Sequence, residues 1–436
     1  METVELPQGL HVALVPGDHL HRSAAAYVVR VGARYEASSQ AGLSHFLEHM
    51  LHRGTPSHPT AHALARAIED LGANLDAATG VDHGSLVVTS PPESFLATLG
   101  ILGQIVTSPV FSEIELERGI VHEELLEDRD ERGRLVDPDG ILRAELFGDH
   151  PLGQPIVGSL RTLRSFDNDA LARHHRRHYT ARSGVLALAG RFPPRDEVLT
   201  TVSTAFAGLP RGARVTAPRF RTAAEPRGLR VVRTHAPQVS LRVGVLGPGR
   251  RSPRVGAAEL LLRVIDDGNA TRLYERLCDG RGLCYEVSAG FEAYDEVGLF
   301  DVAAESQEDR IVEVLETVLG LFAELAKDGP QSDEISRAVA RAEWQAKRSL
   351  DLPETLAEHA ALGMLTREPP SPLARAERMR AVSLEQIRAT AKSMFKPEHL
   401  TVVAVGALSR STERDLRAVL AEAQGRARSP RKKRSR

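Results

Sequence analysis

Apolar residues recur at helical spacing in the segment 42–54, which reads GLSHFLEHMLHRG. They would share one side of a helix: Leu43, Phe46, Leu47, Met50 and Leu51. The other side carries polar residues, namely His45, Glu48, His49 and His52. The pattern predicts an amphipathic helix with two histidines one turn apart and a glutamate beside the second.

Segments rich in β-branched and small apolar residues flank this helix. Strands are expected at residues 10–15, 24–31, 74–80, 84–90 and 183–189. Helical periodicity and end signals predict helices at residues 57–71, 91–109, 141–147, 167–178 and 197–206, and another that begins near Ser112. The first half of the chain therefore mixes strands and helices.

Between residues 210 and 226 the composition shifts to arginine, proline, alanine and threonine with little periodicity, which indicates a linker. The order of elements then repeats, with strands at 229–232, 239–245 and across 285–303, and helices at 255–265, 309–327 and 332–350. A repeat of about 210 residues predicts a duplicated domain. The expected fold is α+β, with two homologous domains, each a largely antiparallel sheet packed with helices. The predicted divisions are a metal-bearing domain at 1–210, a linker at 211–227, a second domain without the metal motif at 228–425, and a disordered basic tail at 426–436.

The polar side of the first helix has residues that could form a metal site. Imidazoles at positions i and i+4 can bind one Zn²⁺, and a glutamate next to the second can accept a proton from water. The order H-x-x-E-H reverses the commoner zinc-protease motif. The same residues also fit an amphipathic surface helix whose polar side faces water. Zinc would need a third protein ligand from another element.

The helix expected after Ser112 offers that ligand. Ser112 to Glu115 reads as a capping box. Glu117 and Glu124 are two turns apart and share a face, whereas Glu123 lies about 100° away from Glu124. An acid-rich helix is also the ordinary pattern of a solvated face.

Composition narrows the function classes. A net charge of −2 gives no reason to expect a nucleic-acid partner, and no apolar run reaches the roughly 18 residues of a membrane helix. Two cysteines six residues apart do not form a disulfide framework, and the N-terminus lacks a signal-peptide pattern. We therefore expect a cytoplasmic protein, unless a leader has been trimmed.

A second histidine cluster lies at His174, His175 and His178. Neighbouring arginines would repel a metal cation, so we expect these histidines at the surface or in an interface.

Three segments together resemble the pitrilysin/insulinase family of inverted-motif zinc peptidases. They are GLSHFLEHMLHRGT (42–55), IEDLGANLDAATG (68–80) and ERGIVHEELLED (117–128). The resemblance covers nearly the whole chain, including FGDHPLGQPIVGSL (147–160) and RLYERLCDGRGLCYEVSA (272–289). The two-domain length is similar to that of the mitochondrial processing peptidase subunits and their bacterial relatives.

The resemblance implies a role for each residue of the motifs. His45 and His49 match the two imidazole ligands of a single zinc ion, and Glu124 matches the third ligand. Glu48 matches the general base. Glu117 matches a supporting carboxylate that orients a ligand histidine.

The family also binds its peptide substrate as an added strand at a sheet edge, which residues 74–79 match here. Asp76 stands where asparagine is usual before Ala77, and a carboxylate cannot donate a hydrogen bond. Tyr285 matches a tyrosine that holds substrate. Cys278, however, occupies the place of the arginine that accompanies it, and a thiol cannot supply the charge of a guanidinium group.

The expected function is that of a zinc metallopeptidase, an endopeptidase for oligopeptides or unfolded segments. It would act in a chamber formed with a homologous inactive subunit that carries the arginine–tyrosine pair. A noncatalytic peptide-binding or scaffold subunit is the alternative. A homodimer would require Arg276 or Arg281 to replace the missing arginine, and Mn²⁺ or Co²⁺ could take the place of zinc.

Overall fold

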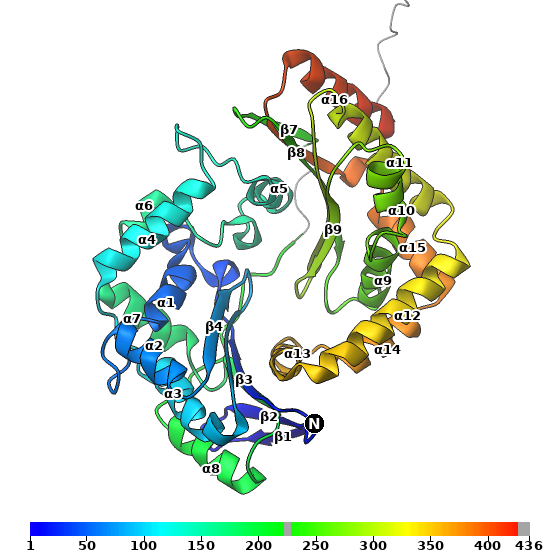
Figure 1. The fold of residues 1–436 in the computed structure, drawn as a ribbon. Helices are drawn as coiled ribbons and strands as arrows, with labels where there is room; N and C mark the ends of the chain where they lie inside the picture. Colours follow the sequence, from blue (N-terminus) through cyan, green and yellow to red (C-terminus); the bar gives the residue numbers. More distant parts are fainter. Residues whose placement is uncertain (222–227, 426–436) are drawn as a thin grey trace, which may run out of the picture. The chain divides into compact units, whose positions relative to one another are not determined.

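The computed structural model describes residues 1–221 and 228–425, which form two compact units (Figure 1). The first unit contains Met1–Glu127, His150–Pro218 and Glu343–Ala376. The second contains Asp128–Asp149, Arg219–Ala342 and the chain from Glu377 onward. Residues 222–227 of the predicted linker and the predicted tail 426–436 lie outside the described residues.

A six-stranded sheet with the order β1-β2-β6-β3-β5-β4 forms the first unit. Its strands are β1 (Glu2–Glu5), β2 (His11–Pro16), β3 (Ser23–Val29), β4 (Asn74–Thr79), β5 (Gly84–Ser90) and β6 (Gly184–Gly190). Neighbouring strands are antiparallel except β2 and β6. Strand β4 forms one edge, beside the helix with the His-Glu-His motif (Figure 1).

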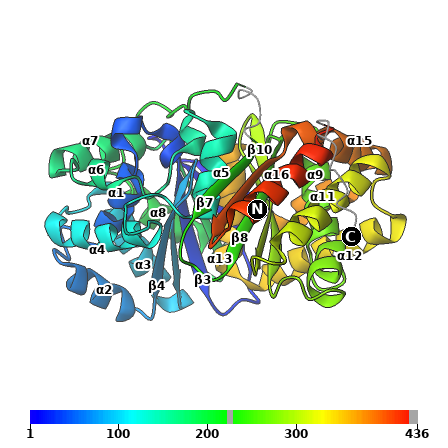
Figure 2. The ribbon, with the colours of Figure 1, turned by 90° about the horizontal axis from the view of Figure 1, so that it is seen from above.

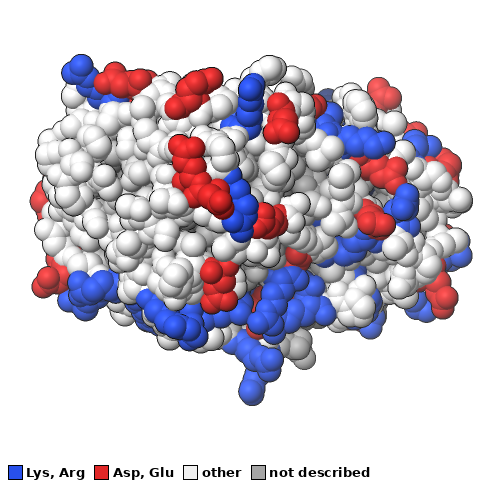
Figure 3. All heavy atoms as spheres, turned by 90° about the horizontal axis from the view of Figure 1, so that it is seen from below, with Lys and Arg blue, Asp and Glu red and all other residues white. Residues whose placement is uncertain are grey.

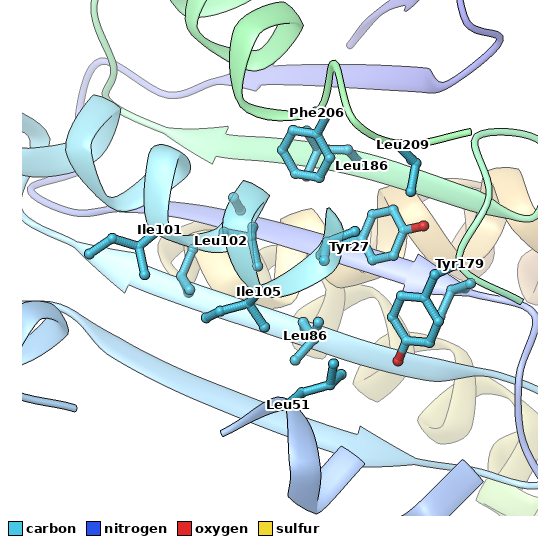
Figure 4. Packing of buried hydrophobic residues seen from close by; sticks show 14 of the residues in the cluster. Tyr27, Leu51, Leu86, Ile101, Leu102, Ile105, Tyr179, Leu186, Phe206 and Leu209 are labelled. Carbon is cyan, nitrogen blue, oxygen red and sulfur yellow. The ribbon is translucent and has the colours of Figure 1, made fainter. Parts of the chain in front are cut away.

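Helices cover one face of this sheet. They are α1 (Leu43–Leu51), α2 (Ala61–Glu69), α3 (Phe95–Thr107), α4 (Ile114–Glu127), α6 (Leu160–Leu163), α7 (Asn168–His178) and α8 (Arg195–Ala205). Leu86 and Leu186 of the strands pack with Ile105 of α3 and Leu51 of α1 in the core between the layers (Figure 4). All five residues of the apolar stripe predicted for α1 are buried. At about 1.5–3 kcal/mol for each buried side chain, this stripe fixes α1 on the sheet.

The opposite face of the sheet is covered by α13 (Pro353–Thr366), which the sequence pattern did not predict. Small residues of the strands, including Ala24, Ala26 and Ala187, face Ala357 and Ala361 of this helix. These side chains are buried, so helix and sheet pack closely with little side-chain volume between them.

The second unit has a five-stranded sheet with the order β7-β11-β8-β10-β9. Its strands are β7 (Leu229–Arg233), β8 (Val239–Pro248), β9 (Val287–Ala293), β10 (Val297–Ser306) and β11 (Thr401–Gly406). Only β7 and β11 are parallel. The arrangement repeats that of β2-β6-β3-β5-β4, including the place of the parallel pair. This confirms the predicted α+β fold of two homologous halves.

The remaining helices belong to the second half of the chain, with one exception. They are α9 (Val255–Ile265), α10 (Arg272–Tyr274), α11 (Ile311–Lys327), α12 (Ser332–Arg348), α14 (Pro372–Arg380), α15 (Leu384–Met394) and α16 (Arg410–Ala423). The exception is α5 (Pro138–Phe147), which packs on β8 and β11. Each unit thus takes one helix from the other half of the sequence, α13 in the first and α5 in the second. The compact units therefore differ from the continuous ranges 1–210 and 228–425 by exchanging these two segments.

Charge is mixed on the surface. Acidic and basic side chains both lie on the face drawn in Figure 3, and neither sign covers it. Among the helices of residues 1–221 and 228–425, none has both the length and the apolar character needed to cross a bilayer.

Two local expectations were wrong. The hydroxyl of Ser112 donates to the Arg53 carbonyl (3.3 Å) instead of forming the predicted capping box. His174 and His178, expected at the surface or in an interface, are buried inside the first unit, where α7 packs against α1. Hydrogen bonds compensate for this burial. Nε2 of His174 lies 3.0 Å from the Ser44 hydroxyl, and Nδ1 of His178 lies 2.7 Å from the Arg30 carbonyl oxygen.

Burial makes this histidine cluster sensitive to acid. Burial lowers the pKa of His178 from 6.5 to about 4, and it also lowers the pKa of His174. A neutral histidine in the fold stabilises it most above pH 6.5, and this stability is lost as the pH falls toward 4. We expect the free energy of unfolding to drop by about 3 kcal/mol for His178 over this range, as measured by urea denaturation at a series of pH values. His178→Gln should flatten the dependence, whereas His62→Gln, at an exposed position, should leave it unchanged. A free energy independent of pH between 6.5 and 4.5 would contradict the buried neutral state.

Candidate metal centre

The N-terminus of α1 is fixed by buried polar groups. Gly42 has a φ of 91°, and a Cβ at this position would lie 2.6 Å from the Val157 carbonyl oxygen, so only glycine fits. The buried carboxylate of Glu36 accepts hydrogen bonds from the backbone N–H groups of Gly42 (2.8 Å) and Ser44 (2.6 Å). Glu36 thereby caps the helix that carries the motif.

Helix α4 lies against α1 on the same side of the sheet (Figure 2). The Glu124 carboxylate on α4 approaches both histidines, with Oε1 3.3 Å from His45 Nε2 and Oε2 3.5 Å from His49 Nε2. One donor atom from each of these three residues lies within 4.8 Å of the other two. In the described part of the chain, they form the group of histidine, cysteine and acidic residues that could hold a metal ion.

Glu117, two turns before Glu124, supports His49. Its Oε1 lies 2.7 Å from His49 Nδ1, and its Oε2 accepts hydrogen bonds from the Arg53 guanidinium. Arg53 also reaches Glu113 at 3.3 Å. Glu117 is therefore held on both oxygens, in a position from which a carboxylate can orient the imidazole. Glu123, by contrast, points into solvent, with 79% of its side chain exposed.

These contacts determine which histidine atom carries hydrogen. An ionised carboxylate can only accept, so Nδ1 of His49 donates to Glu117. In neutral His49, Nε2 then carries no hydrogen, and its lone pair faces Oε2 of Glu124. The two atoms are both acceptors, and at 3.5 Å they repel each other. A cation between them removes this repulsion, whether it is a proton on the imidazole or a metal ion. The residues present therefore fit a divalent ion, which His45, His49 and Glu124 would hold.

The pKa shifts agree with a site that attracts positive charge. Burial lowers the pKa of His49, but Glu117, Glu124 and Glu48 outweigh it and leave the pKa raised. The hydrogen bond from His45 lowers the pKa of Glu124. Burial raises the pKa of Glu117, but the bonds from His49 and Arg53 leave it lowered overall.

Glu48 lies one position before His49 and is half-buried. Its Oε2 is buried and has no hydrogen-bond partner among the described residues. The nearby Tyr179 hydroxyl has a raised pKa because it is buried and because the Glu48 charge disfavours a phenolate. Glu48 therefore has one oxygen available for a proton.

The predicted substrate strand is the edge strand β4. Asp76 is exposed on it and Ala77 is half-buried. A pocket of about 580 Å³ adjoins this strand, with Leu64 and Ile68 among its apolar walls and His52 among its polar ones. Burial lowers the pKa of His52.

Tyr285 and Cys278 lie in the second unit. The Tyr285 side chain is 96% exposed, and Cys278 Sγ lies 3.9 Å from the Tyr285 carbonyl oxygen. The two arginines considered as replacements already have acidic partners: Arg276 pairs with Glu324 (2.8 Å) and Arg281 pairs with Glu313.

Three contributors were not identified from the sequence: Glu36, Arg53 and Tyr179. Arg53 follows His49 by one helical turn, which could have indicated that it reaches the same acidic residue. Glu36 and Tyr179 come from distant segments, and no local pattern marks them.

Comparison with known proteins also relates the chain to zinc peptidases. The family model of insulinase (peptidase family M16) matches residues 12–159. The model described as the peptidase M16 inactive domain matches residues 165–342. An uncharacterized zinc protease of Mycobacterium bovis is 30% identical over 331 residues, 74% of each chain. The uncharacterized zinc protease YmxG of Bacillus subtilis is 24% identical over 407 residues, 90% of this chain and 95% of that protein.

Solved structures share the fold. The peptidase M16 inactive domain from Pseudomonas fluorescens has a TM-score of 0.81 at 22% identity, covering 93% of this chain and 97% of that one. A protease from Helicobacter pylori has a TM-score of 0.83 at 17% identity, covering 93% of this chain and 99% of that one. A chain of Complex III2 from Candida albicans has a TM-score of 0.77 at 15% identity, covering 96% and 99%.

Two α+β units of one strand order, with a His-His-Glu group in the first, define a protein of the zinc-peptidase fold class. The chain belongs to the insulinase family, peptidase family M16, in its half-length form of two units. The resemblance noted in the sequence is thereby confirmed.

The two neighbouring glutamates on α4 provide a matched test of metal binding. Glu124→Gln removes the carboxylate that faces both imidazoles, so we expect its zinc affinity to fall by more than about a hundredfold. Glu123→Gln removes the same charge from an exposed position and should bind zinc normally. Metal analysis after dialysis and competition with a chelating dye would measure both. Equal zinc content in the two variants would exclude this ligand set.

Glu117→Gln tests the supporting carboxylate. The amide retains the size of the side chain, but it attracts the His49 N–H more weakly, so zinc affinity should fall about 10–100-fold. The same competition assay would show this, and circular dichroism would confirm that the fold is intact. An unchanged affinity would mean that Glu117 acts only through its contact with Arg53.

Proposed function

We propose that the chain is a zinc-dependent endopeptidase for oligopeptides or unfolded segments. The observation that carries this proposal is the convergence of His45, His49 and Glu124 with Glu48 beside them. Three ligands leave a coordination place for water and substrate, which is typical of catalytic and not structural zinc.

The chemistry follows from the positions of these residues. A zinc ion would lower the pKa of water and polarise the scissile carbonyl. Glu48 accepts the proton of the attacking water, because its Oε2 is buried and has no hydrogen-bond partner among the described residues. Glu48 then returns this proton to the leaving amine. Glu117 keeps Nδ1 of His49 protonated, so that Nε2 remains a ligand.

Substrate binding is assigned to the edge of β4. Within residues 1–221 and 228–425, this strand pairs with a neighbour, β5, on one side, so its other side offers N–H and C=O groups to an added strand. Backbone pairing of this kind binds extended peptides with limited preference for sequence. Asp76 adds a negative charge at this edge, which should disfavour acidic substrate residues beside it.

We further propose that the working form is a dimer with a homologous subunit that supplies an arginine and a tyrosine. Cys278 carries no charge for this purpose, and burial raises the pKa of its thiol. Arg276 and Arg281 are neutralised by Glu324 and Glu313, which speaks against their use in a homodimer. A partner subunit with the missing arginine would complete the arginine–tyrosine pair.

A second candidate function is a noncatalytic subunit of a peptidase-like complex. The fold supports it, since a chain of Complex III2 has the same architecture. The geometry of the zinc centre favours the enzyme, because a scaffold has no need for a buried base next to three converging ligands.

Glu48→Gln distinguishes the two functions. It should retain zinc, because Glu48 is not among the three ligand residues, and lose peptide cleavage by at least about a hundredfold, as expected when a general base is removed. Cleavage of a quenched peptide library would be followed with the chain alone and with a homologous partner added. Glu123→Gln, with its exposed carboxylate, is the control and should cleave normally.

Equal cleavage by wild type and Glu48→Gln would refute the proposed mechanism. Normal zinc binding without cleavage in any combination of subunits would favour the scaffold.

A further inference from the structure

A pocket of about 450 Å³ lies at one end of the first unit's sheet. Its charged and titratable lining consists of Arg30, Arg182, Arg214, Arg367, His11 and Glu5. None of the residues assigned above to metal, proton transfer or peptide binding lines it. The pocket is therefore separate from the zinc centre.

The order of strands brings these arginines together. Strands β2 and β6 are parallel and begin side by side, with His11 paired to Val185. Strand β3 ends against the start of β6, where Val29 pairs with Gly184, and Arg30 follows directly. Arg182 precedes β6, and Arg367 ends α13 in a left-handed conformation (φ 63°). Three chain segments, at the end of β3, the start of β6 and the end of α13, thus bring Arg30, Arg182 and Arg367 to the lining of one pocket.

Three of the four lining arginines, Arg30, Arg182 and Arg367, have no acidic partner among the described residues. The side chains of Arg182 and Arg367 make no hydrogen bond or ion pair with any residue of the described ranges. Arg30 donates to the Tyr35 hydroxyl (3.3 Å) and to the Leu365 carbonyl, which are neutral partners. Its Nε is buried and has no partner among the described residues. Glu5 is the one carboxylate among the lining residues that the structure describes, and it is exposed.

Converging guanidinium groups repel one another unless an anion lies between them. Arginine presents several N–H donors in a fixed plane, which suits phosphate oxygens. Donors that approach from several directions match the tetrahedral arrangement of phosphate oxygens better than the single plane of a carboxylate. The space exceeds that of one phosphate group and lies within the range of small-molecule sites.

We propose that this pocket binds a small molecule with two adjoining phosphate groups. Arg182 contacts the anion from the start of β6, Arg367 from the end of α13, and Arg30 from the end of β3. Free pyrophosphate and the diphosphate of a nucleotide share this chemistry. The apolar contribution of Val185 and Met364 to the walls gives a base or sugar a surface to pack on.

The experiment measures binding of inorganic pyrophosphate and, separately, of adenosine diphosphate by isothermal titration calorimetry with the full chain. Wild type should bind at least one of them saturably, with an affinity that weakens as salt is added. Arg182→Gln and Arg367→Gln should each weaken binding about tenfold, and the double variant about a hundredfold. Tighter binding of the nucleotide would identify it as the source of the diphosphate, and equal binding would identify the free anion.

Arg164→Gln is the matched control, because Arg164 is an exposed arginine of the same unit and does not line the pocket. It should bind like wild type. Chelation of zinc by phosphate would be the same in every variant, so only differences between variants report on the pocket. Circular dichroism and zinc content of each variant would show that the fold is intact. Absence of saturable binding by wild type, or equal binding by the double variant, would overturn the proposal.

Discussion

The candidate centre depends on one electrostatic constraint, the approach of the Glu124 carboxylate to two imidazoles. Because Glu117 fixes the hydrogen of His49 on Nδ1, the facing nitrogen cannot donate unless the ring gains a proton. The approach of His49 to Glu124 is favourable only when a proton or a metal ion lies between the two side chains. The fit of this group to a metal ion thus depends on the packing of the two helices, and not on the histidines alone.

That packing is costly to disturb. The apolar stripe of α1 is buried in the core, and Glu36 holds the start of the helix. At the other end, Arg53 binds Glu117 of α4, so it ties the two helices together next to the ligands. Buried charges of this kind destabilise a fold when one partner is removed, so the supporting residues fix the geometry as firmly as the core does.

Much of the centre could be predicted because its signals are local. The spacing of His45, Glu48 and His49 lies on one helix, and the seven-residue spacing of Glu117 and Glu124 lies on another. Helix α13 was not predicted because its buried face consists largely of alanine, which gives no clear apolar stripe. The small residues of the strands that it covers likewise give no sign of a helix packed on them. The burial of His174 and His178 escaped for a similar reason, since their partners Ser44 and Arg30 come from distant segments. Periodicity identifies elements well, but it does not identify which elements cover one another.

The exchange of α5 and α13 between the two halves has a consequence for synthesis. The first sheet forms from residues 2–190, yet one of its faces remains bare until α13, at residues 353–366, has left the ribosome. Residues Pro138–Phe147 must likewise wait for a sheet whose last strand ends at Gly406. Neither half can finish folding before nearly the whole chain is made, so a gene split at the linker would yield two fragments with uncovered apolar faces.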